Sequence, residues 1–552
     1  MKTNYLTLSV MALAAAFTAC SQDNEILETN VSDNAQVLTI QAAESGFEAA
    51  EKEGRATDEG AKTEFEDGDK MGLFVVCDNG SVVKSNEPIT YNSATKTWTP
   101  TTTVYYYTNA DYIAYFPYDE DLSVSETTTT DITDGIISAF DTYFKEHKAD
   151  QSNLETYRNA DLMLSTITAA ALAEQTTENK TLNFALKHNY SMIELNVPSY
   201  KYSYTYGEGT KEFSVPMSNF NVTLGDTEVK PCHIGDGVYR MLVEPGEEIK
   251  LTGSFEDPKD QRPVNFSNAS KTKNLAAGSY VKYNITYTGA PDGSKVETRN
   301  IIGDYYCQDG SIYPSDLEAV PTNAIGIIYS TVDGDEFKDE GYQYYVLSIK
   351  ERKQIGFYVN KNSMTDDEKV AAVKDIAGIA HFDAPTEETY QAFAGLTDMS
   401  GYAATTTLRA LTPAYSIVTD LETNWVNNDT YAAPATGTTG WFIPSIGQLV
   451  KLHDILGENG TPAWTWTNSL MSSNTTGAKA QQKFVSLIER VLPDTDDNED
   501  SRLFNKCTWS ATQVTAVDGN SDQFCIEISS SKFQITTKPK TDRRSIRPIL
   551  AF

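Results

Sequence analysis

Short runs in which apolar and polar residues alternate recur between residues 37 and 287, and they constrain the fold of this chain most strongly. Alternation of this kind places successive side chains on opposite faces of a β-strand. In the first run, residues 37–42, Leu38, Ile40 and Ala42 fall on one face. Further strand signals, which are rich in apolar and aromatic residues, lie at residues 71–76, 103–107, 112–116, 192–197, 239–243 and 280–285. Together with 31 tyrosines and many Thr and Ser residues, they predict antiparallel sheets with one face in water.

Length and charge bound the class of protein. At 552 residues the chain is too long for one hydrophobic core, and roughly 150 residues per domain suggests three or four domains. Its 77 acidic and 44 basic residues give a formal charge of −33, which argues against nucleic acid as a partner. Beyond the N-terminal segment, no apolar run reaches transmembrane length. Residues 120–160 have no clear period and predict a loop-rich region.

The first 25 residues have the order of an export signal. Lys2 supplies a short basic region, and Tyr5 to Phe17 form an apolar run that is too short to span a bilayer. The small residues before Cys20 resemble a bacterial lipoprotein signal, which implies cleavage before Cys20 and lipidation of that residue with fatty acids such as palmitate. Residues 21–25, Ser-Gln-Asp-Asn-Glu, resemble the export tag of surface lipoproteins of Bacteroidetes. The alternative is an ordinary signal peptide with an incidental cysteine.

A series of short motifs follows in a fixed order. They are Thr63-Glu64-Phe65, Gly68-Asp69-Lys70-Met71-Gly72, Trp98, Tyr112-Ile113-Ala114-Tyr115-Phe116-Pro117-Tyr118, Asp161-Leu162-Met163, Phe184-Ala185-Leu186-Lys187-His188, Ile193-Glu194-Leu195, Tyr239-Arg240 and Leu275-Ala276-Ala277-Gly278-Ser279-Tyr280. This order resembles the fimbrillin family, the pilin subunits of Bacteroidetes that build donor-strand pili. The resemblance implies two transthyretin-like β-sandwiches, one over residues 35–177 with a removable first strand at 37–42, and one over 178–288. Residues 1–19 would be the signal peptide and 20–34 a tether.

The last part of the chain mixes strand and helix signals. Residues 324–329 and 344–349 predict strands. Thr365-Asp366-Asp367-Glu368 and Ser445-Ile446-Gly447-Gln448 have the spacing of capping boxes, which satisfy free amide groups at the start of a helix. Apolar residues at helical spacing follow each box, and they also predict a third helix over residues 478–492. These signals predict an α+β domain.

This last part resembles the bacterial C-type-lectin-like domains found at the ends of surface proteins. The residues that carry the resemblance are Ala324-Ile325-Gly326-Ile327-Ile328, Tyr345-Val346-Leu347-Ser348-Ile349-Lys350, Gly440-Trp441-Phe442-Ile443-Pro444-Ser445, Gln448-Leu449, Thr508-Trp509-Ser510-Ala511 and Arg544-Ser545-Ile546-Arg547-Pro548-Ile549-Leu550. The resemblance implies a lectin-like domain over residues 301–552, after a linker at 289–300, and a glycan or protein ligand on a host or bacterial surface. The sequence lacks the paired Glu-Pro-Asn and Trp-Asn-Asp motifs of calcium-dependent sugar binding, so that mode is not expected.

One peptide bond is the strongest candidate for processing. Arg55 lies in the segment Glu53-Gly54-Arg55-Ala56-Thr57, in a charged loop that follows the first strand. The fimbrillin resemblance implies that an arginine-specific protease cuts between Arg55 and Ala56 and thereby releases the first strand. The exposed edge would then accept a strand from another pilin subunit. The alternative is that Arg55 is an ordinary solvated loop residue.

Two further pairs of residues are candidate features of the last domain. Five cysteines remain after Cys20 is set aside, and this odd number excludes a fully paired framework. Cys507 and Cys525 flank one predicted hairpin and form the best candidate disulfide, whereas five buried free thiols are the alternative. Trp464 and Trp466 lie in a turn-prone stretch and offer flat rings for ligand stacking, with core packing as the alternative.

The sequence contains no spacing that is typical of a catalytic or metal site. The five histidines are scattered, and His188 is expected to be a core histidine with satisfied hydrogen bonds. The acidic run at residues 494–500 is either a solvated loop or a calcium site. We therefore expect no catalytic residues, no cofactor, no assigned metal ligand and no enzymatic activity.

The fimbrillin resemblance implies that the donated strand comes from the C-terminal end of a subunit, so the C-terminal residues bear on the position of this subunit in a pilus. Residues 545–552 match the closing strand of the lectin-like domain and include Pro548, which would remove a ladder hydrogen bond from a donated strand. The sequence therefore favours a pilus tip adhesin, which accepts a donor strand from another pilin and is exported through an outer-membrane lipoprotein precursor to the cell surface. The alternative is a non-polymerising outer-membrane surface lipoprotein that binds glycan or protein.

Overall fold

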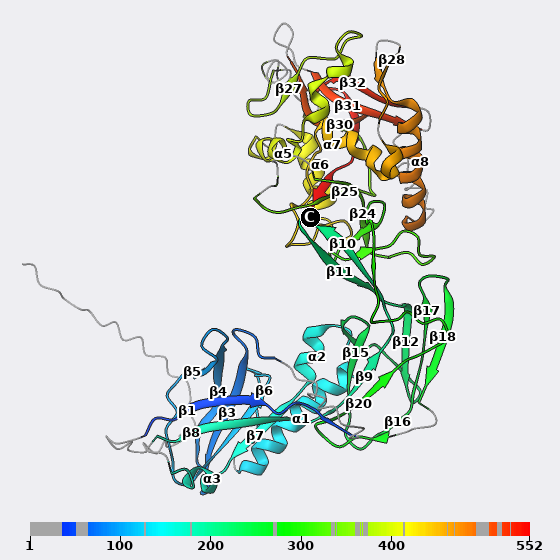
Figure 1. Cartoon of the computed structure of the whole chain (residues 1–552). Coiled ribbons are helices and arrows are strands. Elements are labelled where there is room, and N and C mark those ends of the chain that lie inside the picture. The colour runs from blue at the N-terminus through cyan, green and yellow to red at the C-terminus, as the bar shows by residue number, and fades with distance from the viewer. Residues whose placement is uncertain are drawn as a thin grey trace, which may run out of the picture. The chain divides into compact units, whose positions relative to one another are not determined.

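Figure 1 shows the computed structural model of the chain, which is divided into two compact units. The first unit comprises Met1–Gly46, Lys62–Asp141 and Leu162–His188, and the second comprises Phe47–Ala61, Thr142–Asp161 and Asn189–Phe552. The structure describes residues 36–50, 64–125, 128–176, 179–268, 273–332, 337, 339–358, 365, 367, 374–411, 415–460, 462–467, 470–492, 507–515, 522–529 and 532–552.

The first unit is built on a seven-stranded sheet with the order β1-β8-β7-β6-β3-β4-β5. Its strands are β1 (Thr39–Glu44), β3 (Lys70–Cys77), β4 (Val82–Asn92), β5 (Thr97–Pro100), β6 (Ala110–Phe116), β7 (Met163–Ile167) and β8 (Thr181–His188). Strand β1 is parallel to β8, whereas the other neighbours are antiparallel. The predicted strands at 37–42, 71–76 and 112–116 are confirmed to within two residues. Strand β8 belongs to this first unit, although the predicted boundary between the two sandwiches falls before it, at residue 178.

Two of the sequence motifs are explained by aromatic packing in this unit. Phe65 lies 5.0 Å from Trp98 and 5.2 Å from Phe116, measured between ring centroids. Gly72 on β3 lies under the ring of Tyr115, and a Cβ atom at this position would come within 2.0 Å of that ring. Only glycine therefore leaves room for the Tyr115 ring between β3 and β6.

The prediction of a loop-rich region over residues 120–160 is wrong. Helix α1 (Thr129–His147) and helix α2 (Leu154–Ala160) occupy most of it, and α3 (Ala169–Ala173) follows β7. The hydroxyl of Thr128 accepts a hydrogen bond from the amide of Asp131 at 3.1 Å and donates one to its carboxylate at 2.8 Å. This local pairing caps the start of α1, because it satisfies an amide group that has no partner within the helix.

The predicted strand at residues 103–107 is also wrong. Among the described residues of this segment, Tyr105 forms only an isolated bridge with Val37. The run contains the consecutive residues Tyr105, Tyr106 and Tyr107, and tyrosine side chains favour a strand. The backbone of this segment instead forms hydrogen bonds with the residues just before β1.

The second unit begins with two sheets that share one hydrophobic core. One sheet has the order β14-β15-β9-β20-β2 and the other has the order β13-β12-β17-β18. The core takes Ile193 and Met241 from the first sheet and Val222 and Leu251 from the second. The strands are β2 (Glu48–Ala49), β9 (Ser191–Asn196), β12 (Ser218–Leu224), β13 (Thr227–Val229), β14 (Cys232–Gly235), β15 (Val238–Val243), β17 (Leu251–Asp257), β18 (Arg262–Ser267) and β20 (Ser279–Asn284), with a small pair of β16 (Glu248–Ile249) and β19 (Lys273–Asn274).

A three-stranded sheet occupies part of the expected linker at residues 289–300. It contains β10 (Tyr200–Tyr206), β11 (Gly209–Val215) and β21 (Val296–Thr298), with β21 parallel to β10. Directly after β21, Arg299 forms ion pairs with Asp304 at 2.5 Å and with Asp316 at 2.7 Å. The linker segment is therefore partly ordered by strand pairing and ion pairs.

The C-terminal part combines two sheets with helices, as an α+β region. One sheet has the order β23-β22-β24-β25-β34, and the other has the order β26-β33-β30-β31-β32-β29-β28 with β27 paired to β30. The strands are β22 (Tyr305–Cys307), β23 (Ile312–Tyr313), β24 (Ala324–Thr331), β25 (Tyr344–Ser348), β26 (Arg352–Gly356), β27 (His381–Phe382), β28 (Thr465–Thr467), β29 (Leu470–Ser472), β30 (Cys507–Val514), β31 (Asp522–Ser529), β32 (Lys532–Pro539), β33 (Arg543–Ile546) and β34 (Ile549–Ala551). Helices α5 (Gly401–Ala410), α6 (Ser416–Leu421), α7 (Ile446–Val450) and α8 (Asn474–Val491) accompany them, with 3-10 turns at Tyr390–Ala392, Ala394–Thr397 and Lys451–Gly460 and a π turn at Glu422–Val426.

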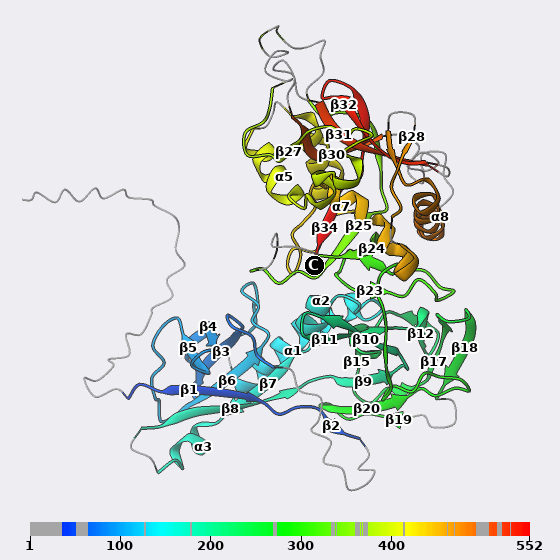
Figure 2. The ribbon, with the colours of Figure 1, turned by 45° about the horizontal axis from the view of Figure 1, so that its top comes forward.

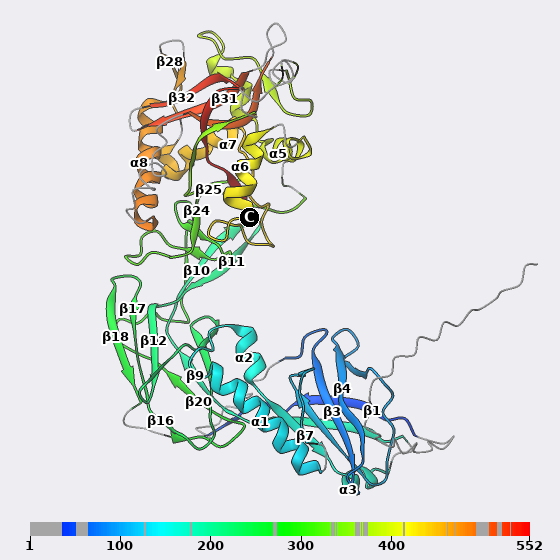
Figure 3. The ribbon, with the colours of Figure 1, turned by 180° about the vertical axis from the view of Figure 1, so that it is seen from behind.

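The helix predictions for this part are largely confirmed. At the start of α7, the Ser445 hydroxyl and the Gln448 side chain form the predicted capping box. Helix α8 contains the predicted third helix and packs against β32, as Figure 3 shows from behind. Most of the helix predicted after Thr365 lies outside the described residues, and Ile376 and Ile379 at its end are buried without helical backbone. Within the described residues, no helix is both long and apolar enough to cross a membrane.

Candidate functional site

Strand β1 of the first unit lies along the edge of β8, and we call the site that it occupies there the groove. The pairing is parallel and in continuous register, with Ile40 opposite Leu182, Ala42 opposite Phe184 and Glu44 opposite Leu186. Figure 2 shows β1 running beside β8. Ile40 on β1 and Leu38 just before it are each 4% exposed, while Thr39, Gln41 and Ala43 face solvent. The groove is therefore lined by the buried, alternating face of β8.

Other main-chain segments hold β1 from its opposite side. The amide of Leu38 donates to the carbonyl of Val104, and the amide of Tyr106 donates to the carbonyl of Gln36, both at 2.9 Å. The indole N–H of Trp98 donates to the carbonyl of Ala42 at 3.3 Å. Residues 36–44 are thus held mainly by hydrogen bonds to their own backbone, on both sides. Any extended chain with suitable side chains can form the same hydrogen bonds.

The inner face of β1 ends in a buried polar pair. The Nε2 atom of His188 lies 2.8 Å from Oε1 of Glu44, and the two side chains are 0% and 4% exposed. Both residues continue the inward-facing series of their strands, after Ala42 on β1 and after Leu186 on β8. The prediction that His188 is a core histidine is confirmed, and its carboxylate partner comes from a residue 144 positions earlier in the chain.

After β1, the chain adds a short strand to the second unit. Strand β2 pairs in parallel with β20, through hydrogen bonds from the amide of Glu48 to the carbonyl of Gly278 at 2.8 Å and from the amide of Ala50 to the carbonyl of Tyr280 at 2.9 Å. Strands β1 and β2 therefore belong to one continuous segment that ends before Arg55. The processing residues Arg55 and Ala56, and the lipidation residue Cys20, lie outside the described residues.

The structure has Cys507 and Cys525 as free thiols, not as the disulfide that the sequence suggests. Cys507 on β30 lies opposite Glu527 of β31, and Cys525 lies opposite Trp509, so the two cysteines are diagonal neighbours on one face of the hairpin. Diagonal Cα atoms in such a pair are roughly 7–8 Å apart, which exceeds the usual span of a disulfide. Burial and the neighbouring Cys507 sulfur raise the pKa of the Cys525 thiol, which makes it a poor nucleophile.

Trp464 and Trp466 are half-buried at the edge strand β28 and the residue before it. Their rings pack against the core of the C-terminal part, with Trp464 6.0 Å from Phe533 and Trp466 6.0 Å from Tyr390 between ring centroids. The stretch is a strand rather than the predicted turn. Each ring contributes to packing and keeps a partly exposed face, so stacking of a ligand stays a prediction.

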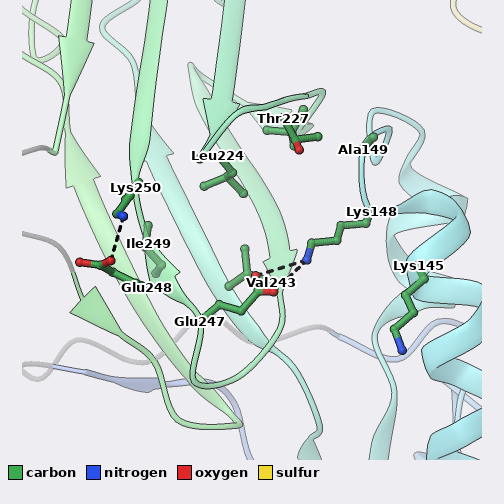
Figure 4. Close-up of a pocket in the computed structure, with 12 residues that line it drawn as sticks. Lys145, Lys148, Ala149, Leu224, Thr227, Val243, Glu247, Glu248, Ile249 and Lys250 are labelled. Atoms are coloured by element: carbon green, nitrogen blue, oxygen red, sulfur yellow. Dashed lines mark hydrogen bonds and ion pairs between the residues drawn. The ribbon is translucent and has the colours of Figure 1, made fainter.

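A pocket of about 550 Å³ in the second unit is a different kind of site. Figure 4 shows Lys148 and Lys250 on its wall, directed toward Glu247 and Glu248 respectively. These ion pairs span 3.2 Å and 3.1 Å, and all four side chains are at least 34% exposed. Exposed ion pairs of this kind contribute little to stability, roughly 0–1 kcal/mol. The pocket brings together no nucleophile and base, so it offers solvated charges rather than a catalytic arrangement.

Sequence reasoning found β1 but missed how it is bound. The alternation of Leu38, Ile40 and Ala42 continues to Glu44, a charged residue on the apolar face, which is a detectable sign of a buried polar partner. The identity of that partner, and the hydrogen bond from Trp98, depend on contacts between residues far apart in the sequence. The acidic run at 494–500 lies outside the described residues, and among the described residues no group of three or more His, Cys, Asp or Glu side chains is placed to hold a metal.

Comparisons with known proteins agree with this architecture. Residues 54–302 match the family model described as "Fimbrillin-like". The chain is 26% identical to a protein of Bacteroides ovatus named "Putative fimbrium tip subunit Fim1C" over 488 residues, which are 82% of this chain and 87% of that protein.

A solved structure shares the fold over most of the chain. The crystal structure of a fimbrial protein from Bacteroides ovatus superposes with a TM-score of 0.52 at 20% identity, and the match covers 94% of this chain and all of the other. At this level of identity the likeness shows the fold alone. Residues 54–302 are thus similar to the fimbrillin-like family, over somewhat less than half of the chain.

Proposed function

We propose that this protein is a structural, adhesive subunit of a cell-surface pilus, placed at the pilus tip, and not an enzyme. Its precursor would be an outer-membrane lipoprotein anchored through Cys20, and the assembled form would be extracellular. The fimbrillin-like match of residues 54–302 and the likeness to a protein named as a fimbrium tip subunit support this proposal.

The observation that carries the proposal is the placement of β1. It fills a groove between β8 and residues 104–106, and it is the segment that a cut between Arg55 and Ala56 would separate from the rest of the chain. Its loss would expose the β8 edge and the apolar pockets of Leu182 and Phe184. An edge with unpaired amide and carbonyl groups binds an incoming strand, so another pilin subunit could complete the sheet by donor-strand insertion.

The tip position is supported by the state of residues 543–552. These residues form β33 and β34 within the C-terminal part, where Phe552 exchanges main-chain hydrogen bonds with Tyr344 at 3.1 Å and 3.2 Å. The Phe552 ring lies 4.5 Å from the Tyr306 ring between centroids. Donation of this segment to another subunit would break the edge of the sheet and expose these rings, which supports the proposal that residues 543–552 are not donated.

Ligand binding is assigned to the C-terminal part. We propose that residues 301–552 form a C-type-lectin-like domain that binds a host or bacterial surface glycan or protein, with Trp464 and Trp466 as candidate stacking residues. Residues 35–177 and 178–288 would be the two transthyretin-like sandwiches that hold it on the pilus. The partly exposed rings of Trp466 on β28 and of Trp464 just before it support this assignment, because aromatic faces stack well on sugars and on partner side chains.

Immunogold labelling of fibres tests the tip position directly. Antibodies against residues 301–552 are expected to label fibre ends, and an Arg55→Ala variant is expected to leave the protein on the membrane and out of fibres. Arg352→Ala, at an exposed position of β26, serves as the matched control and should assemble normally. Label along the whole shaft would reject the tip position. Normal fibres together with a lipidated, uncut protein would favour the alternative, a non-polymerising surface lipoprotein.

A further inference from the structure

We infer that the strand which replaces β1 must carry a carboxylate at the position of Glu44, so that the groove selects partners by charge as well as by apolar pattern. The inference rests on the proposed exchange of β1 for a donor strand. It adds the chemical requirement that this subunit places on its partner.

The two members of the buried pair have different fates when β1 leaves. Glu44 lies on the segment that precedes Arg55, whereas His188 lies on β8 and stays with the subunit. The 2.8 Å contact between their side chains therefore has to be remade by the incoming strand. Because the imidazole of His188 is fully shielded from solvent, a methyl group in place of the carboxylate would remove a hydrogen bond that water cannot replace.

The register of β1 against β8 indicates which other side chains a partner strand needs. Its inward side chains are aliphatic at Ile40, small at Ala42 and acidic at Glu44, and each lies opposite a defined residue of β8. Leu38, just before the strand, adds a second aliphatic side chain that is buried. Trp98 donates a hydrogen bond to the Ala42 carbonyl, and Ala42 packs against the core cluster that contains Trp98. A side chain larger than alanine at position 42 would crowd this packing. A fitting partner strand runs parallel to β8 with the inward series aliphatic, aliphatic, small and acidic at every second position.

The chain's own C-terminal segment does not meet this requirement. Residues 543–552 contain three arginines and no Asp or Glu. Residues 543–552 of a second copy are therefore a poor donor for the groove. The groove instead fits a strand of a partner subunit that carries the acidic series.

Peptide capture tests this requirement on the protein itself. The protein is cut between Arg55 and Ala56 with an arginine-specific protease, and the site of cleavage is verified by mass spectrometry. Fluorescent peptides of residues 36–46 are then added in excess, as wild type and as Glu44→Leu, Glu44→Gln and Gln41→Leu variants. Gln41 faces solvent, so its variant makes the matched apolar change outside the groove.

The inference predicts a graded result. Glu44→Leu should bind roughly 30-fold or more weakly than wild type, because the contact between the carboxylate and the buried imidazole of His188 is lost. Glu44→Gln should lose less, since its amide oxygen still accepts a hydrogen bond, and Gln41→Leu should stay within about twofold. A His188→Leu protein should reverse the preference and favour the Glu44→Leu peptide.

The outcomes separate the two levels of the proposal. If no peptide of this series is captured by the cut protein, the acceptor groove itself is refuted. If wild-type and Glu44→Leu peptides bind equally well, the groove stands and the carboxylate requirement is overturned. The peptide variants leave the protein unchanged, so a folding defect of His188→Leu cannot obscure either result.

Discussion

The indole N–H of Trp98 donates a hydrogen bond to the main-chain carbonyl of Ala42, across a distance of 3.3 Å. Trp98 stays with the subunit after a cut at Arg55, while Ala42 leaves with β1. Because the acceptor is a backbone atom, the same bond is available to any strand that occupies the groove. Trp98 can therefore hold any strand that pairs with β8, and we refer to its hydrogen bond as the clamp. The side chains of the bound strand, on either side of this carbonyl, determine which strand fits.

Loss of this clamp should loosen β1 before any cut is made. We expect Trp98→Phe to lower the free energy of unfolding of the first unit by about 1–3 kcal/mol, because it removes a hydrogen bond and part of a packed ring. Amide hydrogen exchange at residues 39–44 should become faster. The matched control is Trp466→Phe, which makes the same change on β28 and should leave exchange in β1 unaltered. Equal exchange in both variants would show that Trp98 does not hold the strand.

Substitutions in β1 and in β8 should both lower the stability of the uncut protein, but only those in β8 should weaken the attachment of the subunit to fibres. Ile40→Ala should cost the uncut protein about 2–4 kcal/mol, because Ile40 is buried against β8. It should have no effect on the attachment of the subunit to fibres, because the proposed cut removes residue 40 before assembly. Leu182→Ala, on the facing strand β8, should lower the stability of the uncut protein and also weaken the attachment of the subunit to fibres. Denaturant unfolding and heat release of the subunit from purified fibres measure the two effects, and a fibre defect in Ile40→Ala would contradict strand removal.

The capping box that the sequence predicts should stabilise the C-terminal part. The Ser445 side chain bonds to the Asp398 carbonyl and accepts from the Gln448 amide. Ser445→Ala should therefore lower the free energy of unfolding by about 1–2 kcal/mol. Ser486→Ala, at an exposed site on α8, is the control and should change it by less than about 0.5 kcal/mol. Chemical denaturation followed by tryptophan fluorescence measures both, and equal effects would refute the role of the cap.

A buried lysine should give the C-terminal part a pH-dependent stability. Burial lowers the pKa of Lys540 to about 8, while the ammonium group donates to the Lys374 carbonyl and to Oε1 of Gln513. The unfolded lysine keeps a pKa near 10.4 and binds more protons than the folded one between these values, so stability should rise as the pH increases through about 8.

The Lys540→Met variant isolates this effect. Relative to the variant, the wild type should gain about 1 kcal/mol per pH unit between about pH 8 and about pH 9.5, measured by thermal unfolding. The upper limit avoids the titration of tyrosines in the unfolded chain. A difference that stays constant with pH would mean that Lys540 titrates normally in the folded protein.

The strands of this protein could be predicted where local alternation decides the structure. Residues 71–76, 112–116 and 239–243 form strands, and their runs of β-branched and aromatic residues are a local signal for this structure. Helix α1 was missed although a signal exists: Ile132, Ile136, Phe140 and Phe144 recur every four residues, and all are buried. The Thr128–Asp131 cap marks its start in the same way.

The candidate site could be predicted only in part. The apolar face of β1 and the arginine after it are local features, so the sequence identifies the strand. Its parallel pairing with β8, the Glu44–His188 contact and the addition of the two-residue strand β2 to a second sheet all join residues more than 140 positions apart. No local pattern sets such contacts, because they follow from how the sheets are assembled.

The central claim, that β1 is removed and its groove refilled, is tested most directly by the N-terminus of this subunit in purified fibres. Mass spectrometry of the fibre-bound chain should find Ala56 as its first residue and no peptide from residues 36–50, with an acidic strand of another subunit crosslinked beside β8. A fibre-bound chain that begins at lipidated Cys20 and retains residues 39–44 would contradict the account.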